Sequence, residues 1–181
     1  MKQKFVIIAF VILAIGIIYK FRLGEFRNDI KIVDQTAISF TLFDDKSNKH
    51  IVNLDSYISS PDETLGEIAG KIELIVADDY RNRVYVVYSN SGLPGRNGLT
   101  NNILSYDLFT KELQPLLYNE REIYVNNPSD LRLTQDFHYL KLNYGLSDGA
   151  CSLITGTLTW DLNIAGSSAK DDRRIEKLSD C

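Results

Sequence analysis

A continuous apolar run near the amino terminus is the feature that most constrains this chain. Residues 5–19 read FVIIAFVILAIGIIY and contain no charged side chain. A helix of this length covers about 22 Å, whereas the hydrocarbon core of a bilayer is about 30 Å thick. Lys4 and Lys20 flank the run and can extend the span by placing their ammonium groups among lipid headgroups. The run therefore predicts a membrane anchor, with apolar side chains that include Phe5, Ile8, Phe10, Ile12, Leu13, Ile17 and Tyr19.

A cleaved signal peptide and a buried core helix are the two alternatives for this run. Lys20 and Arg22 stand where a signal peptidase needs small residues, which favours an uncleaved anchor. A helix without polar alternation has no face to present to water, which disfavours a core helix. Counting positive charges on the two sides does not decide the orientation. Because the run is made first and a large domain follows, we expect a single-pass membrane protein with a cytoplasmic amino terminus and a periplasmic or cell-surface domain.

The remainder of the chain is acidic. The 181 residues include 20 basic and 24 acidic side chains, and residues 1–22 hold four of the basic ones and no acidic one. Residues 23–181 therefore have a net charge of −8, which excludes nucleic acid as a partner because phosphate contacts need a basic surface. We predict three parts: an anchor over residues 1–22, a juxtamembrane linker over 23–35 and a β-rich extracytoplasmic domain over 36–181.

Alternation of apolar and polar side chains dominates the predicted domain, and this period of two is typical of strands. Clusters of Gly, Asn, Asp and Pro separate the strands, and no long helical crossover lies between them, so the sheet is expected to be antiparallel. Residues 83–88 (RVYVVY) are apolar on both faces, which indicates a central strand. The predicted strands lie at residues 38–42, 51–54, 72–76, 83–88, 103–108, 122–125, 131–133, 140–144 and 152–160.

One or two short helices complete the predicted fold. Residues 60–70 begin with a Ser-Pro-Asp-Glu cap and end at a glycine, which favours two or three helical turns. Residues 169–178 are charged and predict a short surface helix or a loose tail. The expected fold class is mainly β: an N-terminal transmembrane helix followed by an antiparallel β sandwich or an open, blade-like sheet.

A weak internal repeat runs through the domain. Tyr106-Asp107-Leu108 recurs 54 residues later as Trp160-Asp161-Leu162, and each follows a strand-rich stretch. Together with residues 134–140 (TQDFHYL), this pattern over about residues 72–162 resembles the blades of β-propellers, such as WD-repeat proteins and the Tol-type propeller. The chain is too short for a complete propeller, so blade-like meanders in a small sheet are expected, with a partial propeller completed by another subunit as the alternative.

Two cysteines follow the apolar run. Cys151 and Cys181 predict a disulfide if the domain faces an oxidising compartment, and two free thiols if it does not. The bridge would close about 30 residues and stabilise the domain by roughly 3–4 kcal/mol in the loop-entropy account.

The side chains that most often carry chemistry form no recognisable motif. His50 and His138 lack partners at metal-binding spacing, and we expect both at exposed turns. Acid pairs at residues 44–45, 78–79 and 171–172 are expected at solvated turns rather than in a calcium or glycosidase site. We therefore predict no catalytic residue, no metal and no cofactor.

The most distinctive loop spans residues 89–102 (SNSGLPGRNGLTNN), which join two good strands. No lysine is present and a strand follows, so a phosphate-binding loop is rejected. Long loops on rigid sheets often bind partners, and the predicted contact residues are Leu93, Arg96 and Asn97, with an ordinary flexible loop as the alternative.

These observations favour a membrane-anchored extracytoplasmic β domain that acts without catalysis as a binding, scaffold or envelope-assembly module. Its expected partners are the lipid bilayer, through the anchor, and an envelope protein. A pilin-like subunit is one alternative, although the chain lacks the usual processing site and the glutamate inside the apolar helix. An anchored hydrolase that uses two carboxylates is the other alternative.

Overall fold

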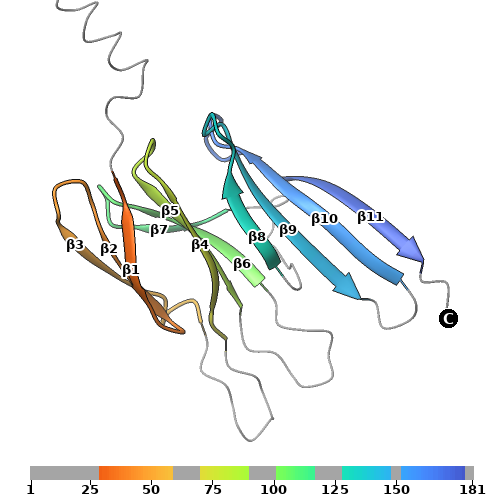
Figure 1. Ribbon diagram of the computed structural model, residues 1–181, viewed down its shortest axis with the longest axis horizontal. Helices are drawn as coiled ribbons and strands as arrows, with labels where there is room; N and C mark the ends of the chain where they lie inside the picture. Colours follow the sequence, from red (N-terminus) through yellow and green to blue (C-terminus); the bar gives the residue numbers. More distant parts are fainter. Residues whose placement is uncertain (1–28, 59–69, 90–100, 117–127, 148–151, 178–181) are drawn as a thin grey trace, which may run out of the picture.

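The computed structural model describes residues 29–58, 70–89, 101–116, 128–147 and 152–177, which form eleven β-strands. The strands make three antiparallel sheets, shown side by side in Figure 1. The first sheet contains β1 (Lys31–Gln35), β2 (Ser39–Phe43) and β3 (Lys49–Asn53). The second contains β4 (Ile72–Asp78), β5 (Arg83–Ser89), β6 (Asn101–Asp107) and β7 (Leu113–Pro115). The third contains β8 (Pro128–Leu133), β9 (Tyr139–Ser147), β10 (Ser152–Asp161) and β11 (Lys170–Lys177).

Each sheet is a meander in which every strand pairs with its neighbour in the sequence. Short turns are sufficient for such connections, which explains the Asp- and Asn-rich punctuation of the sequence. The turns β2–β3, β4–β5, β6–β7, β8–β9 and β10–β11 all lie at the upper end of the view in Figure 1. One end of the domain is thus built from five hairpin turns.

Two hydrophobic cores hold the three sheets together, one on each face of the second sheet. Phe40 and Leu42 of the first sheet pack against Val84 and Val86 in the first core. Tyr85 and Val87, the alternate residues of β5, belong to the second core with Trp160 of the third sheet. Because successive side chains of a strand point to opposite faces, the apolar run 83–88 serves both cores, and its prediction as a central strand is confirmed.

The internal repeat marks equivalent positions in the second and third sheets. Asp107 Oδ1 accepts the Phe109 N–H at 2.9 Å, and Asp161 Oδ1 accepts the Asn163 N–H at 3.0 Å, so each aspartate closes the turn after its strand. The next residue is also equivalent. Leu108 donates its N–H to the Asn82 carbonyl at 3.0 Å, and Leu162 donates its N–H to the His138 backbone carbonyl at 2.9 Å. In both sheets, the leucine that follows the repeated aspartate therefore bonds the third turn of the meander to the first turn.

The predicted fold class is wrong where it includes helices. The described residues are all β and turn, and none of them forms a helix. Residues 170–177, expected as a helix or a loose tail, are β11, which pairs with β10 along its whole length because the Thr-rich β10 offers a long open edge. The expected helix at 60–70 and the strand at 122–125 fall almost entirely outside the described residues.

The membrane helix of the predicted fold class is not part of the described structure. Within the ranges given above, no helix has the length and apolar character needed to cross a bilayer. The anchor residues Phe5, Ile8, Phe10, Ile12, Leu13, Ile17 and Tyr19 lie outside the described residues. β1, which the predicted linker over 23–35 contained, is a strand of the first sheet and pairs with β2.

Candidate functional site

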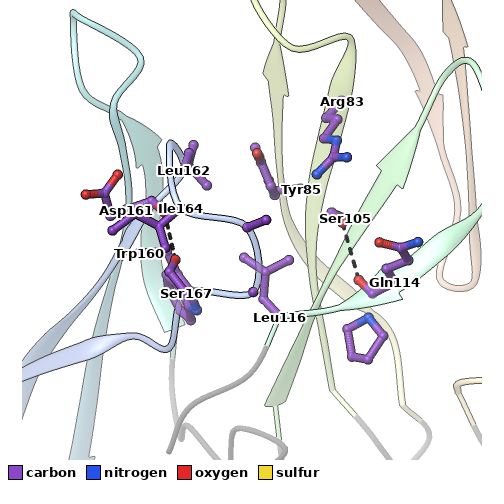
Figure 2. Close-up of a pocket in the computed structure, with 13 residues that line it drawn as sticks. Arg83, Tyr85, Ser105, Gln114, Leu116, Trp160, Asp161, Leu162, Ile164 and Ser167 are labelled. Atoms are coloured by element: carbon purple, nitrogen blue, oxygen red, sulfur yellow. Dashed lines mark hydrogen bonds between the residues drawn. The ribbon is translucent and has the colours of Figure 1, made fainter. Parts of the chain in front are cut away.

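A cleft of about 180 Å³ opens between the second and third sheets, beside the β10–β11 turn (Figure 2). Strands β5, β6 and β7 supply one wall, and the end of β10 with the following turn supplies the other. The residues that line the cleft are Arg83, Tyr85, Ser105, Gln114, Pro115, Leu116, Trp160, Asp161, Leu162, Ile164, Ala165, Gly166 and Ser167.

The base of the cleft is aromatic and rigid. Tyr85 and Trp160 are each 1% exposed and both belong to the second core. Leu116 and Leu162 are partly buried against the same core, and Ile164 above them is 59% exposed. Figure 2 shows Leu162 and Ile164 across the opening from Tyr85 and Leu116. An apolar group that entered the cleft would therefore meet side chains that packing already holds in place.

The polar groups at the rim are balanced in charge and largely engaged with each other. Arg83 places Nη2 3.2 Å and Nε 3.3 Å from Asp107 Oδ2. Ser105 donates its hydroxyl to the Gln114 carbonyl at 3.4 Å, and Ser167 donates to the Asp161 carbonyl at 2.7 Å. The rim can thus orient a ligand by a few polar contacts, and it does not select strongly for either sign of charge.

A buried ion pair fixes the second and third sheets relative to each other beside the cleft. Asp78 has no exposed surface, and its Oδ2 lies 3.2 Å from Arg81 Nη1. The same guanidinium reaches into the third sheet, where it donates to the Phe137 carbonyl and, at 2.9 Å, to Asn163 Oδ1. Arg81 therefore connects the β4–β5 turn with the β8–β9 and β10–β11 turns of the third sheet.

Tyr85 ties the base of the cleft to this ion pair. Its hydroxyl donates to Asp78 Oδ2 at 3.5 Å. Burial raises the pKa of Tyr85 above its ordinary value, and the negative charge of Asp78 adds to the effect. The phenol is therefore neutral and acts as a donor across the physiological pH range.

A smaller hollow of about 50 Å³ lies on the other side of Pro115 and Leu116. Asn102 lines it and is 8% exposed, and its Oδ1 has no hydrogen-bond partner among the described residues. A space of this size accommodates water, which would supply the missing donor.

The sequence-predicted partner residues Leu93, Arg96 and Asn97 lie outside the described residues, as do Cys151 and Cys181. Among the described histidines, His138 is at an exposed turn as predicted, whereas the prediction for His50 is wrong. The His50 side chain is 9% exposed on β3, with Nε2 3.6 Å from Asp44 Oδ2. It faces the first core because it pairs with Leu42 across the sheet.

Two of the three acid pairs depart from the predicted solvated turns, whereas Asp44 and Asp45 lie at the β2–β3 turn as predicted. Asp78 is buried beside Arg81. Asp171 lies in β11 and not in a turn, and its Oδ1 accepts a hydrogen bond from the Tyr144 hydroxyl at 2.7 Å. In the described part of the chain, no three His, Cys, Asp or Glu side chains are grouped closely enough to hold a metal ion.

Sequence reasoning missed the cleft itself. Tyr85 and Trp160 were visible as residues of strong strands, and the repeat singled out Trp160 and Asp161. No pattern in the sequence indicates which two strands face each other across a gap. Comparison with protein-family models, with curated proteins and with solved structures finds no significant match for this chain.

Proposed function

We propose that this chain is a non-catalytic binding module whose cleft receives one apolar side chain of a partner protein. The observation that carries the proposal is the size of the cleft with its aromatic base. Small-molecule and cofactor pockets usually enclose about 300–1,000 Å³. The cleft between β5 and β10 encloses about 180 Å³, which suits a single large side chain.

The walls of the cleft support this role because they are preorganised. Tyr85 and Trp160 are fixed by the second core, and Arg81 bonds the turns of the two sheets together. Binding to rigid walls loses little conformational entropy, and anchor side chains in such pockets supply much of the affinity of protein interfaces.

A hydrolase is less well supported at this cleft. Glycosidase chemistry requires two carboxyl groups about 5–9 Å apart. The residues that line the cleft include only one carboxylate, Asp161, and its Oδ1 accepts the Asn163 N–H. The pilin-like alternative depends on the amino-terminal run and draws no support from the three-sheet arrangement.

The proposed setting is the outer side of a membrane, where an envelope protein is the partner. This part of the proposal depends on the hydropathy of residues 5–19 alone. Cell fractionation with protease treatment of spheroplasts tests it: the domain should stay with the membrane fraction and be cleaved. Recovery in the soluble cytosolic fraction would contradict the setting and leave the cleft proposal in place.

Selection from a displayed library of short random peptides tests the cleft. The wild-type chain should enrich peptides that share one large apolar residue. Ala165→Trp fills the cleft and should weaken their binding more than about tenfold. Thr155→Trp, on the exposed face of β10, is the matched control and should leave binding unchanged. Equal binding by the Ala165→Trp variant, or no enrichment at all, would contradict the proposal.

A further inference from the structure

β11 (Lys170–Lys177) lies at the edge of the third sheet. It pairs with β10 from Ser152↔Lys177 to Thr159↔Lys170, and no described strand lies on its other side. The strand is eight residues long, and nearly all of its side chains are exposed. A long open edge is a template for adding another strand, which proteins commonly prevent with charged side chains. The pattern of charge on β11 therefore decides what can pair with it.

The charges on the outer face of β11 alternate in sign. Asp171 pairs with Leu158 of the second core, so residues 171, 173 and 175 lie on the face toward the second sheet. The intervening side chains lie on the opposite face, because neighbouring residues of a strand alternate. Along the strand these outer side chains are Lys170, Asp172, Arg174 and Glu176, with charges plus, minus, plus and minus.

When the strand is read in the opposite direction, the sign of the charge at each of these four positions is reversed. We propose that β11 pairs antiparallel with β11 of a second copy of this chain, across a two-fold axis at Arg173, to form a continuous eight-stranded sheet. In this register Lys170 lies opposite the partner's Glu176, and Asp172 lies opposite the partner's Arg174. The two-fold axis repeats both matches, so the outer face gains four pairs of opposite charge. Such pairs contribute most where backbone hydrogen bonds already hold the strands.

The neighbouring registers are disfavoured by the same charges. With a two-fold axis normal to the sheet, the register can change only in steps that move the partner of each residue by two positions. A shift in one direction places Asp172 opposite the partner's Asp172, and a shift in the other places Arg174 opposite the partner's Arg174. Like charges directly opposite each other destabilise a sheet. The charge pattern therefore favours this one register and does not prevent strand addition at the edge altogether.

The centre of the proposed interface has one pair of like charges on the inner face. Arg173 lies opposite the partner's Arg173. Within its own chain, however, Arg173 Nη2 is 3.2 Å from Asp171 Oδ2, and its Nε donates to the Tyr144 hydroxyl at 3.3 Å. These contacts draw the guanidinium toward β9 and neutralise it, which removes most of the repulsion at the axis.

Sedimentation velocity of the purified full-length chain, from about 1 to 100 µM at low salt, tests the proposal. The wild type should dimerise, and higher salt should weaken the dimer because the ion pairs are exposed. Arg174→Asp places like charges opposite each other at two symmetric positions, and the dissociation constant should rise more than about tenfold. Asp172→Arg combined with Arg174→Asp restores opposite charges and should restore the dimer.

Lys141→Glu is the matched control, since it makes the same change of charge on the outer face of the third sheet but in β9, away from the edge. It should leave the dimer unchanged. A monomeric wild type at the highest concentration overturns the proposal, as does a dimer that survives Arg174→Asp. A double variant that stays monomeric while its circular dichroism is native overturns the register. None of these results depends on the cleft, so the proposed function is tested separately.

Discussion

The ring of Tyr144 occupies the space above Gly156, its partner across β9 and β10. A β-carbon at residue 156 would overlap Tyr144 Cζ, closer than two non-bonded carbon atoms can approach. The Tyr144 hydroxyl donates to Asp171 Oδ1 at 2.7 Å, so the ring is fixed at its far end as well. The glycine thus allows a tyrosine from β9 to reach across β10 to β11.

Gly156→Ala should therefore destabilise the domain. The added methyl group forces the Tyr144 ring to move, and the hydrogen bond to Asp171 is lost or distorted. We expect a loss of about 1–3 kcal/mol in the free energy of unfolding, measured by urea denaturation.

Gly145→Ala is the control for this substitution. Gly145 is also a strand glycine in β9, but a β-carbon there would meet no atom within 4 Å. Its replacement should change stability by less than about 0.5 kcal/mol or increase it slightly, because alanine reduces the entropy of the unfolded chain. Equal losses for the two variants would show that the Tyr144 contact has no special weight.

Lys111 offers a site where glycine should stabilise the chain. Its φ of 59° places a residue with a β-carbon in the left-handed region at the β6–β7 turn, and its side chain is exposed. Lys111→Gly relieves this strain and should raise the free energy of unfolding by roughly 0.5–1 kcal/mol, measured by urea denaturation. Lys111→Ala keeps the strain and should give no gain. A loss with glycine would mean that the lysine stem contributes packing that outweighs the strain.

These turns show how far sequence reasoning reaches. Alternation located most of the described strands, because a half-buried strand needs an apolar residue at every second position. The tight turns were harder to predict, because Lys111 and Phe137 stand in left-handed positions where glycine is usual. Hydrogen bonds to Asp107 and Thr134 hold these two residues there, and such bonds between backbone groups leave no residue-type signal.

The cleft and β11 were beyond sequence reasoning for a different reason. Residues 170–177 carry a helix-like mixture of charges, and only pairing with β10 makes them a strand. Trp160 and Tyr85 come together in one core only because two sheets pack, and neither strand records its partner in its own pattern.

The Asp78–Arg81 ion pair should be costly to break from one side. Arg81→Met leaves the Asp78 carboxylate without exposed surface and without its cation, and it removes the links to Phe137 and Asn163. We expect a loss of about 3–5 kcal/mol in the free energy of unfolding. Asp78→Asn combined with Arg81→Met should be less destabilised than Arg81→Met alone. A double-mutant cycle by chemical denaturation measures the difference, and strict additivity would contradict the coupling.

Asp44 should make stability depend on acidic pH. Its side-chain hydrogen bond from Asn48, 2.8 Å long, lowers the pKa of Asp44 below its ordinary value. A lowered pKa in the folded state means that the stabilisation is complete above the unfolded pKa of about 4 and is lost as pH falls through the folded pKa. Asp44→Asn should therefore show a shallower fall in melting temperature below about pH 4 than the wild type. Parallel curves for the two proteins would contradict this role.

The disulfide between Cys151 and Cys181 remains a prediction, and the register of the last hairpin makes it sharper. Ser152 lies opposite Lys177, so Cys151 directly precedes one paired residue and Cys181 follows the other by four positions. Four residues of chain can span up to roughly 14 Å, which is ample for a bridge.

Peptide mapping under non-reducing conditions should recover the linked pair from protein exported to an oxidising compartment. Reduction or Cys181→Ser should lower the free energy of unfolding by roughly 3–4 kcal/mol, mainly through the entropy of the unfolded chain. Two free thiols in the exported protein would contradict both the bridge and the oxidising setting inferred from residues 5–19.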